Sequence, residues 1–168
     1  MERLFIDFSV DKLRQLETRI QHCLTLLTLE QIWWRGSEES NSVGNLVLHL
    51  SGNVRQWVIS AVGGAPDIRQ RAGEFAARGG MPADQLIKGL KETMDEAVPL
   101  ISNLSREKLT ATVVVQGYNQ SVVEVVYHVV EHFALHAGQI MYATKLLQKV
   151  DLGFYRHLHS STHSEKTP

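Results

Sequence analysis

Apolar residues recur every three to four positions over long stretches of this chain, and this periodicity limits the possible fold more than any other feature. Residues three and four apart share one face of a helix, so the pattern is typical of amphipathic helices. It predicts four helices, over residues 9–28, 42–62, 82–104 and 121–148. Almost no segment alternates apolar and polar residues as a half-buried strand would. The sequence therefore predicts an all-α fold.

The expected helix starts carry suitable capping residues. Ser9 is a fair N-cap for the first helix, and Asn41 or Ser42 for the second. Pro82 suits the first position of the third helix, because its fixed φ favours the helix and its missing N–H costs nothing there. Ser121 opens a Ser-Val-Val-Glu capping box before the fourth helix.

A charged segment separates the second and third predicted helices. Residues 67–75 lie between the pairs Gly63-Gly64 and Gly79-Gly80, and this connection is too long for a tight turn. We expect a crossover containing about one helical turn, and hence an antiparallel four-helix bundle with a long crossover between helices 2 and 3. Residues 108–119 are expected to be extended or irregular, with a turn at residues 117–119.

Length and composition favour one domain over residues 1–156, followed by a polar tail at 157–168. Seventeen Lys and Arg residues balance eighteen Asp and Glu residues, so a nucleic acid or an anionic membrane is not the expected partner. No apolar run is long enough for a membrane span, and no leader segment is evident, which favours a cytoplasmic protein. The single cysteine, Cys23, is expected to pack among apolar neighbours.

Histidines are spaced four residues apart more often than chance predicts. Eight histidines in 168 residues would give about 0.4 such pairs at random. Three pairs occur, namely His128/His132, His132/His136 and His159/His163. Residues four apart lie one above the other on a helix face, where two imidazoles can bind one metal ion.

Helix geometry selects one pair and a third partner. His136 lies roughly 40° from the centre of the apolar stripe of the fourth helix, His132 roughly 80° and His128 roughly 120°. His49 lies at the edge of the stripe of the second helix. His49, His132 and His136 therefore form a candidate metal site between two facing helices. Hydrogen-bonded histidines at a helix interface are the alternative, and spacing alone does not separate the two interpretations.

A second motif competes for the same residues. His128 to His132 spells H-x-x-E-H, the inverted zinc-protease pattern, in which both histidines bind zinc and Glu131 activates water. That pattern needs a further carboxylate downstream, and the chain offers only Asp151 and Glu165 after His136. We regard this interpretation as the weaker one.

Three segments resemble the DinB/YfiT-like metalloenzyme superfamily, most closely a bacterial branch of it. They are residues 48–57 (LHLSGNVRQW), 67–75 (DIRQRAGEF) and 131–140 (EHFALHAGQI). The resemblance implies a four-helix bundle with a long crossover, often a homodimer. It also implies a divalent metal, commonly zinc or nickel, on His49, His132 and His136. His128 occurs in many relatives without regularly binding the metal, so it is a candidate pocket residue.

Three neutral imidazoles would leave open positions on the ion, whereas a closed structural site normally supplies four protein ligands. Characterised relatives include S-transferases and isomerases that use a low-molecular-weight thiol, so the resemblance implies a small-molecule substrate and thiolate activation. Metal-dependent hydrolysis is the chemical alternative. A non-catalytic metal-binding or metal-sensing bundle, or a dimeric scaffold, belongs to a different functional class.

Polar residues near the histidines are candidates for a substrate pocket. Asn53, Gln139 and Tyr142 either line such a pocket or form hydrogen bonds between helices. Charged residues of the segment between the glycine pairs either pair with one another on a loop or bind an anionic substrate; they are Asp67, Arg69, Arg71 and Glu74.

Overall fold

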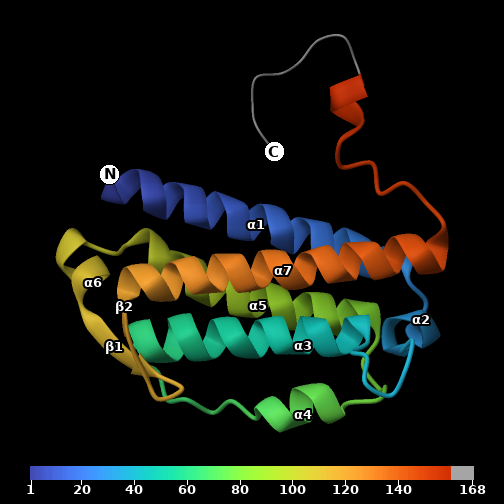
Figure 1. The fold of residues 1–168 in the computed structure, drawn as a ribbon, viewed down its shortest axis with the longest axis horizontal. Helices are drawn as coiled ribbons and strands as arrows, with labels where there is room; N and C mark the ends of the chain where they lie inside the picture. Colours follow the sequence, from blue (N-terminus) through green and yellow to red (C-terminus); the bar gives the residue numbers. More distant parts are fainter. Residues whose placement is uncertain (160–168) are drawn as a thin grey trace.

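Four long helices lie side by side in the computed structural model, which describes residues 1–159 (Figure 1). They are α1 (Glu2–Leu26), α3 (Val43–Val54) with its continuation η1 (Arg55–Val62), α5 (Ala83–Ser102) and α7 (Val122–Gln148). Helices α1 and α3 each pack against both α5 and α7. The prediction of a mainly helical protein is confirmed.

The apolar stripes of the four helices meet in a single core. Side chains that are less than 1% exposed come from every long helix: Leu13, Ile20, Leu50, Leu90, Met94 and Phe133. All of them belong to stripes that the sequence periodicity had marked. Burial of these side chains is the main force that holds the helices together.

Helix α1 starts earlier than predicted. It begins at Glu2, so Ser9 lies inside the helix and is not its N-cap. The Ser9 hydroxyl donates to the carbonyl of Phe5 at 2.7 Å, and the residue is buried. Ile6 joins the core at 2% exposure, which extends the apolar stripe one turn toward the N-terminus.

Helix α3 has a firm start and an unusual continuation. Ser42 is its N-cap and forms a reciprocal capping box with Asn45. From Arg55 the helix widens into the π-helix η1, which ends with the Gly63 N–H donating to the Val58 carbonyl at 2.9 Å. This π-helix was not predicted from the sequence, since π-helical turns have no simple sequence periodicity.

Three short helices lie in the connections. They are α2 (Leu29–Trp33), α4 (Arg71–Ala76) and α6 (Arg106–Thr110). The segment between η1 and α5 runs back along α3, and α4 packs against that helix (Figure 1). This packing brings the charged segment close to the middle of α3.

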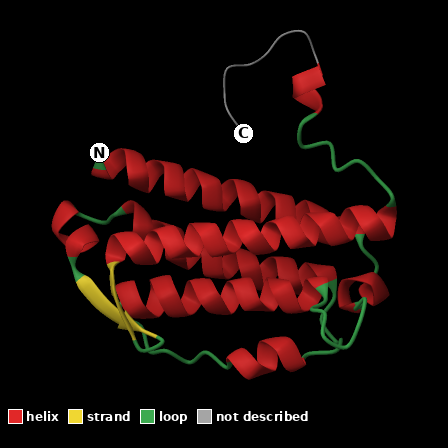
Figure 2. Ribbon diagram, viewed as in Figure 1, coloured by secondary structure: helices red, strands yellow, loops and turns green. Residues whose placement is uncertain are grey.

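A small β-hairpin begins in the segment 108–119, which was expected to be extended or irregular, and it adds two short strands to the helical fold (Figure 2). Strands β1 (Thr112–Val115) and β2 (Tyr118–Ser121) pair antiparallel, with Val115 opposite Tyr118. Gln116 and Gly117 both have positive φ, 52° and 82°, as the common two-residue hairpin turn requires. The turn therefore precedes the predicted position, and the β-branched valines before it favour a strand.

Beyond α7 the chain turns at Lys149, which has a left-handed conformation, and reaches the short 3₁₀-helix η2 (Arg156–His159). Most of the predicted tail at 157–168 lies outside the described residues. None of the helices formed within residues 1–159 is both long and apolar enough to span a membrane.

Candidate metal centre

Three histidines from two helices converge on one point between α3 and α7. Each of His49, His132 and His136 offers a ring nitrogen, and these three nitrogens all lie within 4.8 Å of one another. The Nε2 atoms of His49 and His132 are 2.9 Å apart. Ring centroids are separated by 4.5 Å between His132 and His136 and by 5.1 Å between His49 and His136. The arrangement matches the site that helix geometry predicted.

Helix α7 positions two of the rings through its core contacts. Phe133 and Ala137 are fully buried and fix the face of α7 that points into the core. His132 and His136 precede these residues by one position each, so they lie together at the edge of that face, toward α3. His49 is 5% exposed, whereas the two histidines of α7 are half-buried.

Hydrogen bonds behind the rings select which nitrogen is free to bind a metal. The Nδ1 atom of His49 is 2.9 Å from Oε2 of Glu74, and Nδ1 of His136 is 2.7 Å from Oε1 of Gln139. A carboxylate or an amide oxygen can only accept, so both Nδ1 atoms carry the proton. The Nε2 atoms of His49 and His136 are then unprotonated and can act as metal ligands.

Arg69 also lies close to the His49 ring, with Nη2 3.1 Å from Nδ1. Arginine can only donate, so it cannot bond a protonated Nδ1. The same Nη2 atom donates instead to Oε2 of Glu74 at 2.9 Å. We therefore assign the shorter contact, from His49 to Glu74, as the hydrogen bond of this ring.

Burial keeps the histidines of α7 uncharged. Burial, together with charge repulsion from the nearby His136, His49, His128 and Arg69, lowers the pKa of His132 to about 3. Burial also lowers the pKa of His136, although the hydrogen bond to Gln139 opposes that shift. Neutral imidazole is the form that binds metal ions.

The residues fit a divalent transition metal. Nitrogens that bind one ion at about 2.0–2.1 Å lie about 2.9 Å apart at a right angle and about 3.4 Å apart at a tetrahedral angle. The separation of 2.9 Å between His49 and His132 agrees with that range. In the described part of the chain, this is the one cluster of three or more His, Cys, Asp or Glu side chains with such spacing. Imidazole ligands suit zinc, nickel and copper better than calcium or magnesium.

His128 lies beside the cluster and outside the candidate ligand set. Its ring packs on Trp57 with centroids 4.0 Å apart, and it is 5.5 Å from the ring of His132. Burial lowers the pKa of His128, so it too is neutral. Glu131 is exposed, and Asp151 is 70% exposed and pairs with Arg156. These placements give no support to the inverted-protease interpretation, and its other carboxylate, Glu165, lies outside the described residues.

The three other predicted pocket residues, Asn53, Gln139 and Tyr142, differ in their exposure to solvent and in their hydrogen bonds. Asn53 is buried one turn from His49, and its Oδ1 atom has no hydrogen-bond partner. Gln139 is exposed and accepts the hydrogen bond from His136 described above. Tyr142 is 67% exposed on α7.

Two of the four charged residues named for the connection, Asp67 and Arg71, have other partners than the histidines in the structure. Asp67 accepts from Gln56 at 2.7 Å and from the backbone N–H of Arg69 at 3.0 Å. The exposed guanidinium of Arg71 lies over the ring of Phe75 at 5.0 Å. Phe75 in turn lies 4.7 Å from the ring of His49. Arg71 therefore approaches the cluster only through an intervening aromatic ring.

Glu74 was expected to pair with its charged neighbours or to bind an anion, and it does pair with Arg69. Its contact with His49 was not predicted, and neither was a role for Gly52. The charged segment was recognised, but its sequence does not indicate which of its charges turns toward α3. Gly52 lies in the segment 48–57 that resembles the superfamily, but nothing in that segment singled it out. Its importance as open space for Glu74 depends on the packing of α4, which no local signal encodes.

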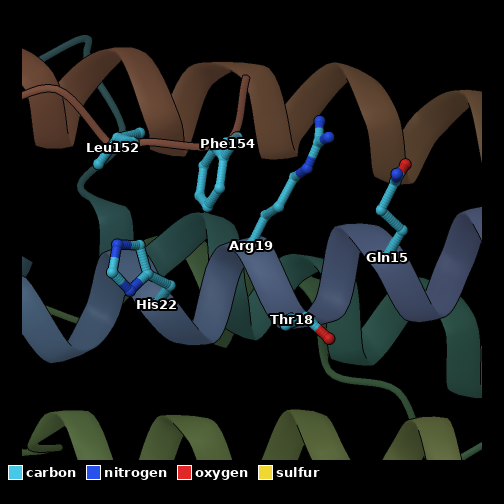
Figure 3. Close-up of a pocket in the computed structure, with 6 residues that line it drawn as sticks. All are labelled: Gln15, Thr18, Arg19, His22, Leu152 and Phe154. Atoms are coloured by element: carbon cyan, nitrogen blue, oxygen red, sulfur yellow. The ribbon is translucent and has the colours of Figure 1, made fainter. Parts of the chain in front are cut away.

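A separate open cavity of about 550 Å³ lies between α1 and the C-terminal segment (Figure 3). Its lining consists of Gln15, Thr18, Arg19, His22, Leu152 and Phe154. None of the three clustered histidines lines it, so it is distinct from the candidate metal centre.

A sequence model of the family described as "Protein of unknown function (DUF1572)" matches residues 1–156. The chain belongs to the DUF1572 family. No curated protein matches this DUF1572 chain.

Solved structures with the same fold include DinB-like proteins. One from Bacillus cereus ATCC 10987 has a TM-score of 0.63 at 15% identity, covering 79% of this chain and 85% of its own. A DinB-like protein from Bacillus subtilis has a TM-score of 0.67 at 16% identity, covering 88% and 96%. A conserved protein from Enterococcus faecalis has a TM-score of 0.72 at 14% identity, covering 86% and 97%. The resemblance to the DinB/YfiT-like superfamily is thereby confirmed at the level of fold.

Proposed function

We propose that this DUF1572 protein is a metal-dependent enzyme built on a DinB-type four-helix bundle with a long crossover. Its divalent ion, zinc or nickel, would be held by His49, His132 and His136. The observation that carries the proposal is the convergence of three imidazole nitrogens within 4.8 Å, with no fourth His, Cys, Asp or Glu grouped with them among residues 1–159. A site with three protein ligands keeps positions open for substrate, as catalytic zinc sites do.

The reaction that we propose joins a low-molecular-weight thiol to a small-molecule electrophile. A carbon–sulfur bond would form, the thiol proton would pass to solvent, and the leaving group of that carbon would depart with its bonding electron pair. When bound, a divalent ion on neutral ligands lowers the pKa of a thiol or water at an open position. The chain's own contribution is to hold three uncharged imidazoles in place, so that the positive charge of the ion is not neutralised by its ligands. His132 and His136 are half-buried while His49 is buried, so a small molecule would approach from the α7 side.

Metal binding is tested first, by measuring the metal content of purified protein and titrating metal-free protein with zinc alone. We expect His49→Ala, His132→Ala and His136→Ala each to weaken zinc binding by at least about 100-fold, because each removes a direct ligand. His128→Ala is the matched control and should keep binding. Unchanged affinity in the first three variants would refute the site. Loss in His128→Ala and His132→Ala but not in His136→Ala would favour the inverted-protease pairing.

Turnover separates the proposed chemistry from its alternatives. Metal-loaded protein is assayed with a thiol and an electrophile, and in parallel with esters and amides in the absence of thiol. Thiol-dependent turnover that is lost in His136→Ala would support S-transfer. Turnover without thiol would indicate a hydrolase, and tight metal binding without either activity would indicate a metal-binding scaffold.

A homodimer and a cytoplasmic location stay predictions from the sequence. Sedimentation of the purified protein at several concentrations would test the first, and fractionation of expressing cells the second.

A further inference from the structure

Glu74 is a nearly buried carboxylate with two partners, one of which is a candidate metal ligand. Its side chain is 10% exposed. Oε2 lies 2.9 Å from Nδ1 of His49, and Oε1 accepts from Nε of Arg69 at 2.7 Å. In an imidazole ring, Nδ1 and Nε2 point in different directions. Glu74 therefore contacts His49 from behind, while Nε2 faces His132 at 2.9 Å.

We propose that residues 67–76 form a positioning strap, in which Glu74 fixes the orientation and tautomer of His49 and Arg69 fixes Glu74. This inference rests on the proposed metal site, because a fixed Nε2 lone pair matters only if something binds there. Carboxylates that accept from the second nitrogen of a metal-binding histidine commonly raise its affinity for the ion. Glu74 is a positioning residue in this scheme and does not touch the metal.

The guanidinium of Arg69 bonds the carboxylate of Glu74 and is too buried to bind a ligand from solvent. Its side chain is 3% exposed. Nε and Nη2 donate to the two oxygens of Glu74 at 2.7 and 2.9 Å, a paired geometry that fixes the carboxylate plane. Nη1 donates to Oε1 of Gln56 at 2.9 Å, which ties the strap to η1. Both oxygens of Glu74 therefore act as hydrogen-bond acceptors.

Gly52 provides the space in which this carboxylate sits. A Cβ atom at residue 52 would overlap Oε1 of Glu74 and lie 2.8 Å from its Cδ. Glycine lowers helix stability relative to alanine, so its presence inside α3 has a local cost. The contact with Glu74 explains why glycine is present here, because the Cβ of any larger residue would displace the Glu74 carboxylate from His49.

Two further contacts hold the strap on α3, one from Asn45 to the strap backbone and one from Phe75 of the strap to His49. Nδ2 of Asn45 donates to the carbonyls of Glu74 and Ala77 at 2.8 and 3.0 Å. The ring of Phe75 packs 4.7 Å from the ring of His49. The strap therefore contacts α3 through its backbone, a charged side chain and an aromatic ring. These contacts indicate a segment fixed on α3 and not a mobile loop that binds substrate.

Zinc affinity of the otherwise intact protein tests the strap. We expect Glu74→Ala to weaken zinc binding by about 10–100-fold and Glu74→Gln to weaken it less, because an amide oxygen can still accept from Nδ1. Glu131→Ala is the matched control, since it removes one exposed carboxylate next to His132. It should leave the affinity within about 2-fold.

A glycine substitution tests the same strap without removing any polar group. Gly52→Ala should weaken zinc binding about as much as Glu74→Ala, while Gly89→Ala, where a Cβ meets nothing within 4 Å, should not. Thermal unfolding of each variant shows whether it is folded. If Glu74→Ala fails to fold, Glu74→Gln and Gly52→Ala carry the test.

Nuclear magnetic resonance of the imidazole nitrogens provides a readout that needs no metal. In the metal-free wild type, His49 should be the Nδ1–H tautomer, and in Glu74→Ala the Nε2–H form should become populated. Wild-type protein that binds no zinc would refute the proposed function, while this tautomer shift would still support the strap. Tight zinc binding that Glu74→Ala and Gly52→Ala leave unchanged, together with an unaltered tautomer, would overturn the strap and leave the metal site standing.

Discussion

At the scale of single residues, burial decides the protonation state of the candidate site. His132 illustrates this, because burial and three neighbouring imidazoles hold its pKa near 3, far below the value of 6.5 for a free histidine. Charging that ring would place a cation beside Arg69 and three other histidines. The ring of His132 is therefore neutral over the whole physiological pH range.

This shift predicts how the stability of the metal-free protein depends on pH. Between pH 6.5 and about 3 the unfolded chain binds a proton at His132 that the folded chain does not. Stability is therefore complete above pH 6.5 and decreases as the pH falls through this window. We expect this residue to contribute a loss of about 1 kcal/mol by pH 5, after allowing for solvent near a half-buried ring.

Urea unfolding of the metal-free protein at pH 7.5 and pH 5.0 measures this loss. His132→Gln removes the titrating group and should show a smaller difference between the two pH values. Equal differences in the variant and the wild type would mean that His132 is not the source.

The three candidate ligands were predictable from sequence because helix periodicity is local. Spacing of four placed His132 and His136 together, and the apolar stripe showed which side of α7 they share. Glu74 was not predictable in the same way. Its contact with His49 spans 25 positions in the chain and depends on how α4 packs on α3.

At the scale of elements, reciprocal capping boxes define where the key helices begin. Ser121 and Glu124 start α7, and Ser42 and Asn45 start α3. The first pair was predicted from its motif. Asn45 was not singled out, because the common capping box has Glu or Gln at that position. In the structure it also bonds the strap, so one side chain joins two elements.

Substitutions of Asn45 separate these two roles. Asn45→Ala removes both the cap and the bonds to the strap, and we expect it to lower the free energy of unfolding by about 2–3 kcal/mol. Asn45→Asp keeps oxygen acceptors for Ser42 and Arg35 but loses the donors to the carbonyls of Glu74 and Ala77.

Chemical denaturation and zinc titration of both variants measure the outcome. Asn45→Asp should retain more of the stability than Asn45→Ala and still bind zinc more weakly than the wild type. Wild-type affinity in Asn45→Asp would show that this side chain does not anchor the strap.

At the scale of the whole molecule, one core unites the four long helices. Cys23 lies in it with no exposed surface, as its apolar neighbours in the sequence suggested. Burial raises the pKa of its thiol, although a hydrogen bond with Thr144 of α7 opposes the shift. The thiolate is the reactive form, so the native protein should protect this side chain.

Labelling of Cys23 with a thiol reagent should therefore report the opening of the core. We expect no modification of the folded protein over hours at pH 8, and rapid modification once urea unfolds it. The native chain has no second thiol to obscure the signal. Rapid labelling under native conditions would show that α1 and α7 separate locally without global unfolding.

The sequence by itself determined the helices, their inward faces and the three histidines, because each of these depends on neighbours within two turns of the same helix. The predictions that were wrong concerned short segments, namely the start of α1 and the hairpin turn, where helix, strand and turn signals overlap within a few residues. Tertiary packing alone decided that α4 lies on α3 and brings a carboxylate behind His49. Such a contact depends on the path of a long connection, and no periodicity in the chain records that path.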